Sequence, residues 1–224
     1  MGSTISITSA DGFSFSAYRA EPEGPTRGGV VVIQEIFGVN DHIRKVADRY
    51  AAAGYLAIAP AVFDRAERGV ELGYTPEDMQ KGFGFAFQKC KFEDVLADAA
   101  AAGRLAASAG KVGIVGYCFG GLVTAASAIH SASVFSAASS YYGGNTTSLI
   151  DRKPAIPLMA HYGRLDQYIP MTDVDKIRAA WSAAEIHVYD SDHGFNCEQR
   201  PVFEPQAAAV ALARTLRFFA EHIG

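Results

Sequence analysis

"GIVGYCFGG", residues 113–121, contains the pattern that decides the fold of this chain. The apolar run that leads into Gly116 is typical of a buried strand, and the residues after Cys118 are typical of a helix. Cys118 therefore falls at a sharp turn from strand to helix. Gly116 and Gly120 flank it, where larger side chains would collide with neighbouring backbone. The pattern predicts either a tightly packed structural cysteine or a nucleophile raised at the head of a helix, which would favour its thiolate.

Strands and helices alternate on both sides of this stretch. The first residues alternate around Asp11-Gly12, which indicates a β-hairpin. Continuous apolar runs predict strands at 29–34, 55–60, 111–117, 133–143, 155–163 and 185–190. Helices are expected at 40–53, from Thr75 onward, and at 92–107, 119–130, 171–183 and 204–222. This order predicts an α/β fold: one domain, residues 1–224, with a mainly parallel central sheet, helices on both faces and an N-terminal hairpin.

Composition narrows the classes of function. The chain has 224 residues, a net charge of −4 and a pI of about 5.9, which do not favour nucleic acid or an acidic membrane surface as a partner. No apolar run approaches the roughly 18–20 residues of a membrane span, and no secretory leader is recognisable. Three widely spaced cysteines without CxxC pairs favour a reducing, cytoplasmic location. We expect a cytoplasmic monomer or small homo-oligomer that acts on a small molecule, with no metal and no cofactor.

Two further loops after predicted strands carry reactive side chains, Asp166 and His193. The carboxyl ends of parallel strands meet at one edge of a sheet, so these side chains are expected near Cys118. A nucleophile, an acid and a histidine in this chain order favour a nucleophilic triad. Asp190 and Asp192 compete for the role of the acid. Asp166 is preferred, because the side chain of Asp192 would normally point away from the adjacent histidine.

The remaining histidines are expected to have structural positions. His42 and His222 fall on predicted helices and are expected to be solvated, His130 lies near a helix end, and His161 and His187 fall within strands.

A carboxylate, Glu35, follows the first buried strand after the hairpin. Such a residue is either a solvated or capping carboxylate at a strand end or a part of the site. The loop after this strand conventionally supplies one oxyanion donor, and the residue after the nucleophile supplies the other. The backbone N–H groups of Ile36 and Phe119 are therefore the expected oxyanion hole. Glu35 would then lie close to Cys118, where it could accept the thiol proton.

Four segments together resemble the dienelactone hydrolase family of the α/β-hydrolase fold: QEIFGVNDHIRKVADRYAAAGYLAIAP at 34–60, GIVGYCFGG at 113–121, HYGRLDQYIP at 161–170 and DSDHGFN at 190–196. The resemblance implies a Cys118–His193–Asp166 triad. It also implies that Glu35 holds the resting thiol and takes its proton when substrate arrives. The thiolate would attack an ester or lactone carbonyl, and water guided by His193 would release the acid.

One departure from the family concerns the substrate. The resemblance implies two arginines that hold a substrate carboxylate, one shortly after the catalytic histidine. Cys197 stands near that place, and an arginine comes only at position 200. For the other, Arg65, Arg68 and Lys81 are available without a secure match. The phenylalanines of GFGFAF (82–87) suggest a more apolar pocket wall, so Phe83 and Phe87 are candidate substrate contacts together with Arg65 and Lys81.

We therefore predict a hydrolase of small carboxylic esters or lactones, with dienelactone as one candidate substrate, acting through an acyl-thioester. The alternative is an α/β-hydrolase fold that is catalytically silent and serves as a binding or signalling module, because a fold does not by itself imply an activity.

Overall fold

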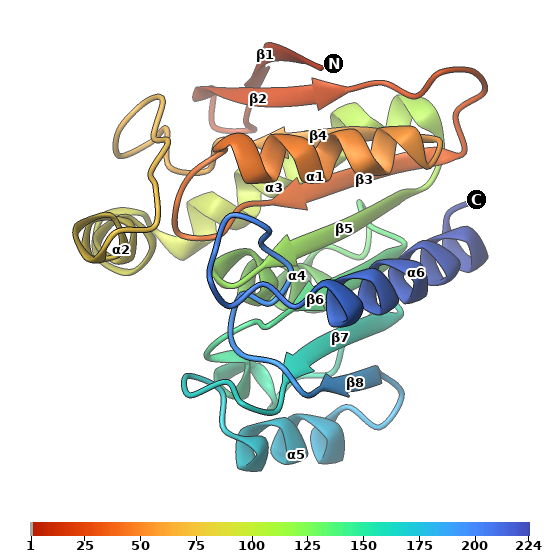
Figure 1. Cartoon of the computed structure of the whole chain (residues 1–224). Helices are drawn as coiled ribbons and strands as arrows, with labels where there is room; N and C mark the ends of the chain where they lie inside the picture. Colours follow the sequence, from red (N-terminus) through yellow and green to blue (C-terminus); the bar gives the residue numbers. More distant parts are fainter. Residues whose placement is uncertain (1) are drawn as a thin grey trace.

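The computed structural model describes residues 2–224, and all eight strands lie in one sheet. The strand order is β1-β2-β4-β3-β5-β6-β7-β8 (Figure 1). The first two pairings are antiparallel and every later pairing is parallel. The strands are β1 Ser3–Thr8, β2 Ser14–Ala20, β3 Gly28–Ile33, β4 Tyr55–Pro60, β5 Val112–Tyr117, β6 Ala137–Tyr141, β7 Leu158–Gly163 and β8 Glu185–Tyr189.

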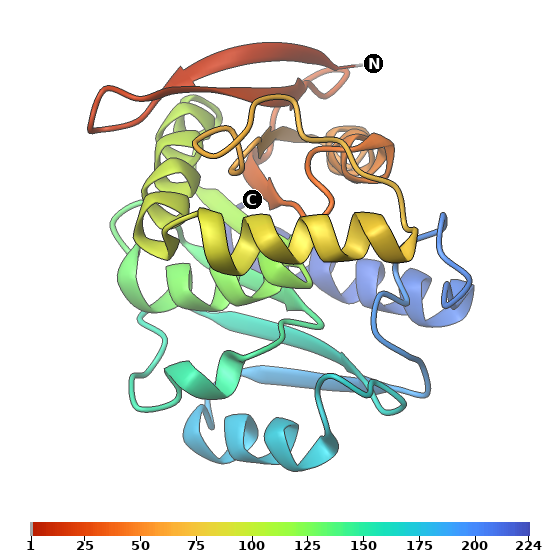
Figure 2. The ribbon, with the colours of Figure 1, turned by 90° about the vertical axis from the view of Figure 1, so that its left-hand side faces the viewer.

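Helices cover both faces of this sheet, as predicted. Helices α1 and α6 lie on one side of the sheet, and α3 and α4 lie on the other (Figures 1 and 2). The α-helices are α1 Asp41–Ala52, α2 Pro76–Gly84, α3 Phe92–Ala106, α4 Phe119–His130, α5 Met171–Ala180 and α6 Pro205–His222. None of the helices in the described part of the chain combines the length and apolar character that crossing a bilayer requires.

The predicted elements occur with small differences at their ends. The hairpin turns at Asp11-Gly12, and Thr75 caps α2 through a reciprocal bond with Asp78. Strand β6 begins only at Ala137, four residues later than expected, since the residues before it form a turn. Helix α5 ends at Ala180, before the buried Trp181, whose indole N–H donates to a backbone carbonyl.

The sequence did not predict the short turns that are not α-helical, which include the 3₁₀ helix Thr146–Leu149. Helix α2 continues into a π-helical turn, Phe85–Lys89, which alternation and capping signals do not reveal. Figure 2 looks onto the edge of the sheet where the parallel strands finish, and this α2–π segment crosses that edge. The segment therefore lies on the side of the molecule where a functional site of a parallel sheet is expected.

The start of α4 packs unusually close to the sheet. A Cβ added at Gly120 would overlap the carbonyl oxygen of Ile33 and come within 2.5 Å of that of Gln34. A Cβ at Gly116 would overlap the carbonyl oxygen of Gly120. These are buried backbone atoms and cannot move aside as a flexible side chain can. Glycine at both positions is thus a condition for the β5–α4 turn.

We predict that Gly120→Ala destabilises the protein by at least about 2 kcal/mol, since relief of the overlap requires backbone movement in β3. Helix propensity alone would make the alanine variant more stable by about 1 kcal/mol. A loss of stability would therefore indicate the backbone overlap. Urea denaturation measures this loss. Gly144→Ala is the control, because no atom lies within 4 Å of an added Cβ there. Equal midpoints for the two variants would contradict the close approach.

Candidate active site

Cys118 occupies a strained position between β5 and α4. Its backbone has φ 54° and ψ −114°, a left-handed conformation that non-glycine residues seldom adopt. The residue is fixed there by its own N–H, which donates to the Tyr141 carbonyl at 3.0 Å, and by its carbonyl, which accepts from Gly121 at 2.9 Å. The turn leaves the thiol half-buried at the head of the helix.

His193 and Asp166 meet across two loops at the same edge of the sheet. Nδ1 of His193 lies 2.7 Å from Oδ2 of Asp166, and both side chains are buried. The other carboxylate oxygen accepts from the backbone N–H groups of Tyr168 and Ile169, at 2.8 and 3.1 Å. Those two bonds fix the carboxylate, and the carboxylate in turn orients the imidazole ring.

The environment of His193 favours its protonated form. Burial alone would lower the pKa of His193. The neighbouring sulfur of Cys118 and the hydrogen bond to Asp166 outweigh burial and raise this pKa to about 10. The imidazole is thereby suited to carry a proton next to the sulfur.

The two competing aspartates have other partners. Oδ1 of Asp192 accepts from the backbone N–H of His193 at 2.6 Å, so its carboxylate faces the main chain rather than the ring. Asp190 is exposed and forms an ion pair with Arg164 at 2.7 Å.

Glu35 follows β3 and is 1% exposed, and neither of its carboxylate oxygens has a hydrogen-bond partner among residues 2–224. The guanidinium of Arg200 lies 3.6 Å from Oε1, a distance of charge attraction rather than of a hydrogen bond. Sequence reasoning gave Arg200 no role. Only its presence in the loop after His193 could have drawn attention to it.

The two expected oxyanion donors are free to bind a ligand. Within the described chain, neither the Ile36 N–H nor the Phe119 N–H donates to another residue. Phe119 is the first residue of α4, where helix geometry leaves N–H groups unpaired.

Aromatic side chains surround the reactive groups. The rings of Tyr142 and Tyr168 pack edge-on against His193, with centroids 5.1 and 5.2 Å away. Phe87 packs against Phe119 at 5.6 Å and against Phe83 at 4.7 Å. Four large apolar side chains on these segments are exposed, and we call them the apolar rim: Phe83, Phe87, Leu165 and Tyr168.

The two cationic candidates for substrate binding are occupied elsewhere. Arg65 forms ion pairs with Asp98 at 2.8 Å and Asp11 at 2.7 Å, which link the hairpin turn to α3. Lys81 pairs with Glu67 at 3.2 Å on the surface.

The prediction for His42 was wrong. This residue of α1 is completely buried rather than solvated, and its Nδ1 lies 2.8 Å from Oε2 of Glu198. Burial would lower the pKa of His42, but the neighbouring Cys197 and the hydrogen bond to Glu198 raise it to about 9. Helical periodicity does place His42 beside the inward-facing Ile43 and Val46, which was the available signal.

Comparisons with known proteins identify relatives of this chain. The family model described as "Dienelactone hydrolase family" matches residues 15–223. Two relatives named "Putative carboxymethylenebutenolidase" are similar to the chain. The one from Synechocystis is 35% identical over 91% of this chain and 90% of its own length, and the one from Azospirillum brasilense is 36% identical over 98% and 99%. A crystal structure described as a "Putative Dienelactone Hydrolase" from Klebsiella pneumoniae has a TM-score of 0.85 and 31% identity, covering 98% of this chain and all of the other.

We predict that the stabilising effect of Asp166 depends on pH. Because the pKa of His193 is raised by folding, its proton stabilises the native state fully below about pH 6.5, and this contribution is lost as pH rises through about 10. Asp166→Asn removes the carboxylate that holds the proton. Urea denaturation should therefore show a larger loss of unfolding free energy at pH 6 than at pH 10.5.

Asp190→Asn is the matched control, because its carboxylate lies at the surface and pairs only with Arg164. It should change stability little at either pH. A loss for Asp166→Asn that is equal at both pH values would show that His193 is not held protonated by this carboxylate.

Proposed function

Because the chain belongs to the dienelactone hydrolase family and is thus a hydrolase, we propose that it cleaves small carboxylic esters or lactones with Cys118 as the nucleophile. His193 and Asp166 complete the proposed triad. The observation that carries this proposal is the 2.7 Å bond between His193 and Asp166, together with the left-handed backbone of Cys118 at the head of α4. These features match the roles of nucleophile, base and orienting acid.

In the proposed first half-reaction, the thiol proton passes to Glu35 as the Cys118 side chain turns toward His193. The thiolate then attacks the substrate carbonyl, and a carbon–sulfur bond forms while the carbonyl electrons move to oxygen. The N–H groups of Ile36 and Phe119 stabilise this oxyanion. When the tetrahedral intermediate collapses, the carbon–oxygen bond to the leaving group breaks. The leaving oxygen takes a proton from the His193 imidazolium, and an acyl-thioester remains.

In the second half-reaction, neutral His193 accepts a proton from water, and the resulting hydroxide attacks the thioester carbonyl. The carbon–sulfur bond breaks and the Cys118 thiolate leaves. The carboxylic acid product releases its proton to solvent, and Glu35 returns its proton to the Cys118 thiolate, so the resting thiol is restored beside the His193 imidazolium. The thiolate is a good leaving group, which favours breakdown of the acyl-thioester.

The apolar rim supports neutral substrates as the preferred class. Arg65 and Lys81 are paired with carboxylates, and the guanidinium of Arg200 faces Glu35. Phe87 and Tyr168 instead offer aromatic faces beside Phe119 and His193. We therefore propose small alkyl or aryl esters, with an uncharged leaving group, ahead of substrates that carry their own carboxylate.

We predict that Cys118→Ala lowers kcat on an aryl acetate at least about 10³-fold, because no other side chain replaces the thiolate. Release of the phenol, followed by absorbance, measures it. Cys90→Ala is the matched control, since this half-buried cysteine lies outside the proposed triad. Its activity should stay within about twofold of the wild type. Equal rates for wild type and Cys118→Ala would exclude Cys118 as the nucleophile.

We also predict that Phe87→Ala raises KM for an aryl ester by about tenfold and changes kcat less, because it removes an aromatic wall that binds substrate and transition state alike. Val210→Ala on α6 is the control, as it truncates another exposed apolar side chain. The same KM in wild type and Phe87→Ala would remove Phe87 from the substrate site.

A further inference from the structure

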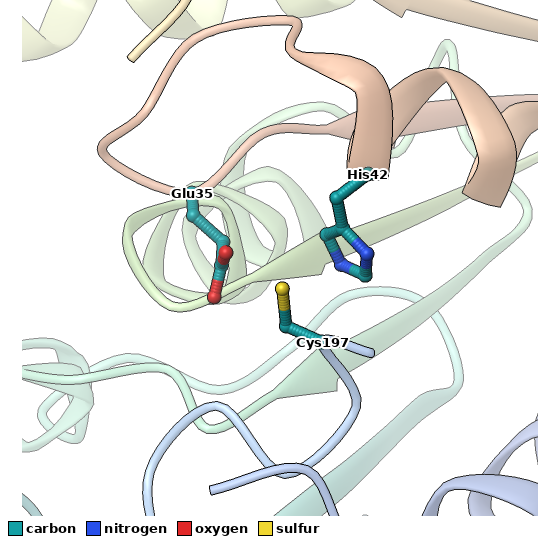
Figure 3. A group of neighbouring side chains, drawn as sticks. All are labelled: Glu35, His42 and Cys197. Atoms are coloured by element: carbon teal, nitrogen blue, oxygen red, sulfur yellow. The ribbon is translucent and has the colours of Figure 1, made fainter. Parts of the chain in front are cut away.

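Three buried side chains from distant parts of the sequence converge behind the proposed triad. Glu35 comes from the loop after β3, His42 from the first turn of α1, and Cys197 from the loop between β8 and α6 (Figure 3). One ligand atom of each lies within 4.8 Å of the others, and all three residues are buried. Figure 3 shows the Cys197 sulfur pointing between the carboxylate and the imidazole ring.

The cluster contains polar atoms that nothing in the described chain satisfies. Both carboxylate oxygens of Glu35 and Nε2 of His42 are buried without a hydrogen-bond partner. Leaving such atoms unpaired costs about 1–3 kcal/mol each, and more for a charged group. One ligand atom of each residue lies within 4.8 Å of the others, so a single cation in this volume would contact all three residues.

The surroundings of the cluster hold its members in a metal-binding orientation. Nδ1 of His42 lies 2.8 Å from Oε2 of Glu198, which leaves Nε2 as the atom that faces the cluster. A carboxylate on the second nitrogen is the usual support of a histidine that binds a metal. The hydroxyl of Tyr74 lies 3.2 Å from the sulfur of Cys197 and fixes the third donor.

We propose that Glu35, His42 and Cys197 form a binding site for a divalent transition metal of the Zn²⁺ type. Sulfur, nitrogen and carboxylate oxygen are the donors that Zn²⁺ takes, and water would complete a tetrahedron. Binding replaces the S–H bond of Cys197 by a sulfur–metal bond and the N–H bond at Nε2 of His42 by a nitrogen–metal bond, and both protons are released to solvent. Glu198 is partly exposed and touches His42, so the site lies one residue below the surface.

Charge at the site suits a dication. The thiolate and the Glu35 carboxylate supply two negative charges, and Glu198 supplies a third behind His42. Arg200, 3.6 Å from Glu35, is the cation that now faces this carboxylate, and a metal would compete with it. The three ligands are separated by seven and by 155 positions in the sequence, so no spacing motif could reveal them.

Occupation of this site inhibits ester hydrolysis, a consequence that rests on the proposed function. Glu35 is the group proposed to take the thiol proton of Cys118, and a metal on its oxygens would withdraw it from that task. The site is therefore a point of inhibition by Zn²⁺ rather than a cofactor site.

Co²⁺ is the probe for binding, because a cysteine ligand gives it a sulfur-to-metal absorption band in the near ultraviolet that does not depend on activity. The whole chain is titrated as wild type, Cys118→Ala, Cys197→Ala and Cys90→Ala. We expect the band in wild type, Cys118→Ala and Cys90→Ala, and its loss in Cys197→Ala. His42→Gln should weaken Co²⁺ binding at least about tenfold without removing a cysteine. Circular dichroism checks that each variant is folded.

The competing metal site is the Cys118–His193 pair itself. A band that disappears in Cys118→Ala and persists in Cys197→Ala would overturn the proposal, as would the absence of a band in folded wild-type protein.

In parallel, Zn²⁺ should inhibit aryl acetate hydrolysis by wild type and by Cys90→Ala at concentrations where the Co²⁺ band forms. The ratio of activity with and without Zn²⁺ should return to near one in Cys197→Ala. Binding at Cys197 without inhibition would refute the inhibitory role alone, whereas a fully active Cys118→Ala enzyme would refute the proposed function and leave the binding result intact.

Discussion

The contact of α4 with the ends of β3 and β5 is the constraint on which the site depends. Gly120 touches the carbonyls of Ile33 and Gln34, and Gly116 touches that of Gly120. This contact forces the chain to reverse within one residue, and Cys118 takes the left-handed conformation as a result. The same contact holds the start of the helix beside the loop that carries Glu35. One backbone approach therefore positions the sulfur, a carboxylate and two unpaired N–H groups.

Charge is distributed around this turn in three pairs of opposite sign. Asp166 supports a proton on His193 on one side of the sulfur. On the other side, Arg200 faces Glu35 and His42 bonds to Glu198. Each buried anion thus has a cationic or protonatable neighbour, which is the condition for keeping it ionised away from water. The loop from β8 to α6 contributes one residue to each of these pairs, so its path connects the proposed triad with the deeper cluster.

The sequence was most informative where local rules act. Period and capping signals predicted the helices that begin at Thr75 and Phe119, and continuous apolar runs predicted the buried strands. Order along the chain brought Asp166 and His193 to one edge of the sheet. Order along the chain could not predict the contacts of His42 or Arg200, because their partners lie more than 150 positions away in the sequence. Nor could it predict the π-helical turn at Phe85–Lys89, because that turn depends on packing against Phe63 and Phe119 rather than on a local pattern.

The buried tyrosines behind the site have a consequence for alkaline solutions. Tyr50, Tyr117, Tyr141 and Tyr142 form a contiguous cluster that includes the last residues of β5 and β6, and burial raises the pKa of every one of these phenols. A phenol that ionises only after exposure binds its proton more tightly in the native state, so native stability falls as pH rises beyond about 10. Tyrosinate absorbance would then appear together with unfolding. The absorbance of these tyrosines therefore reports the cooperative unfolding of the protein at alkaline pH.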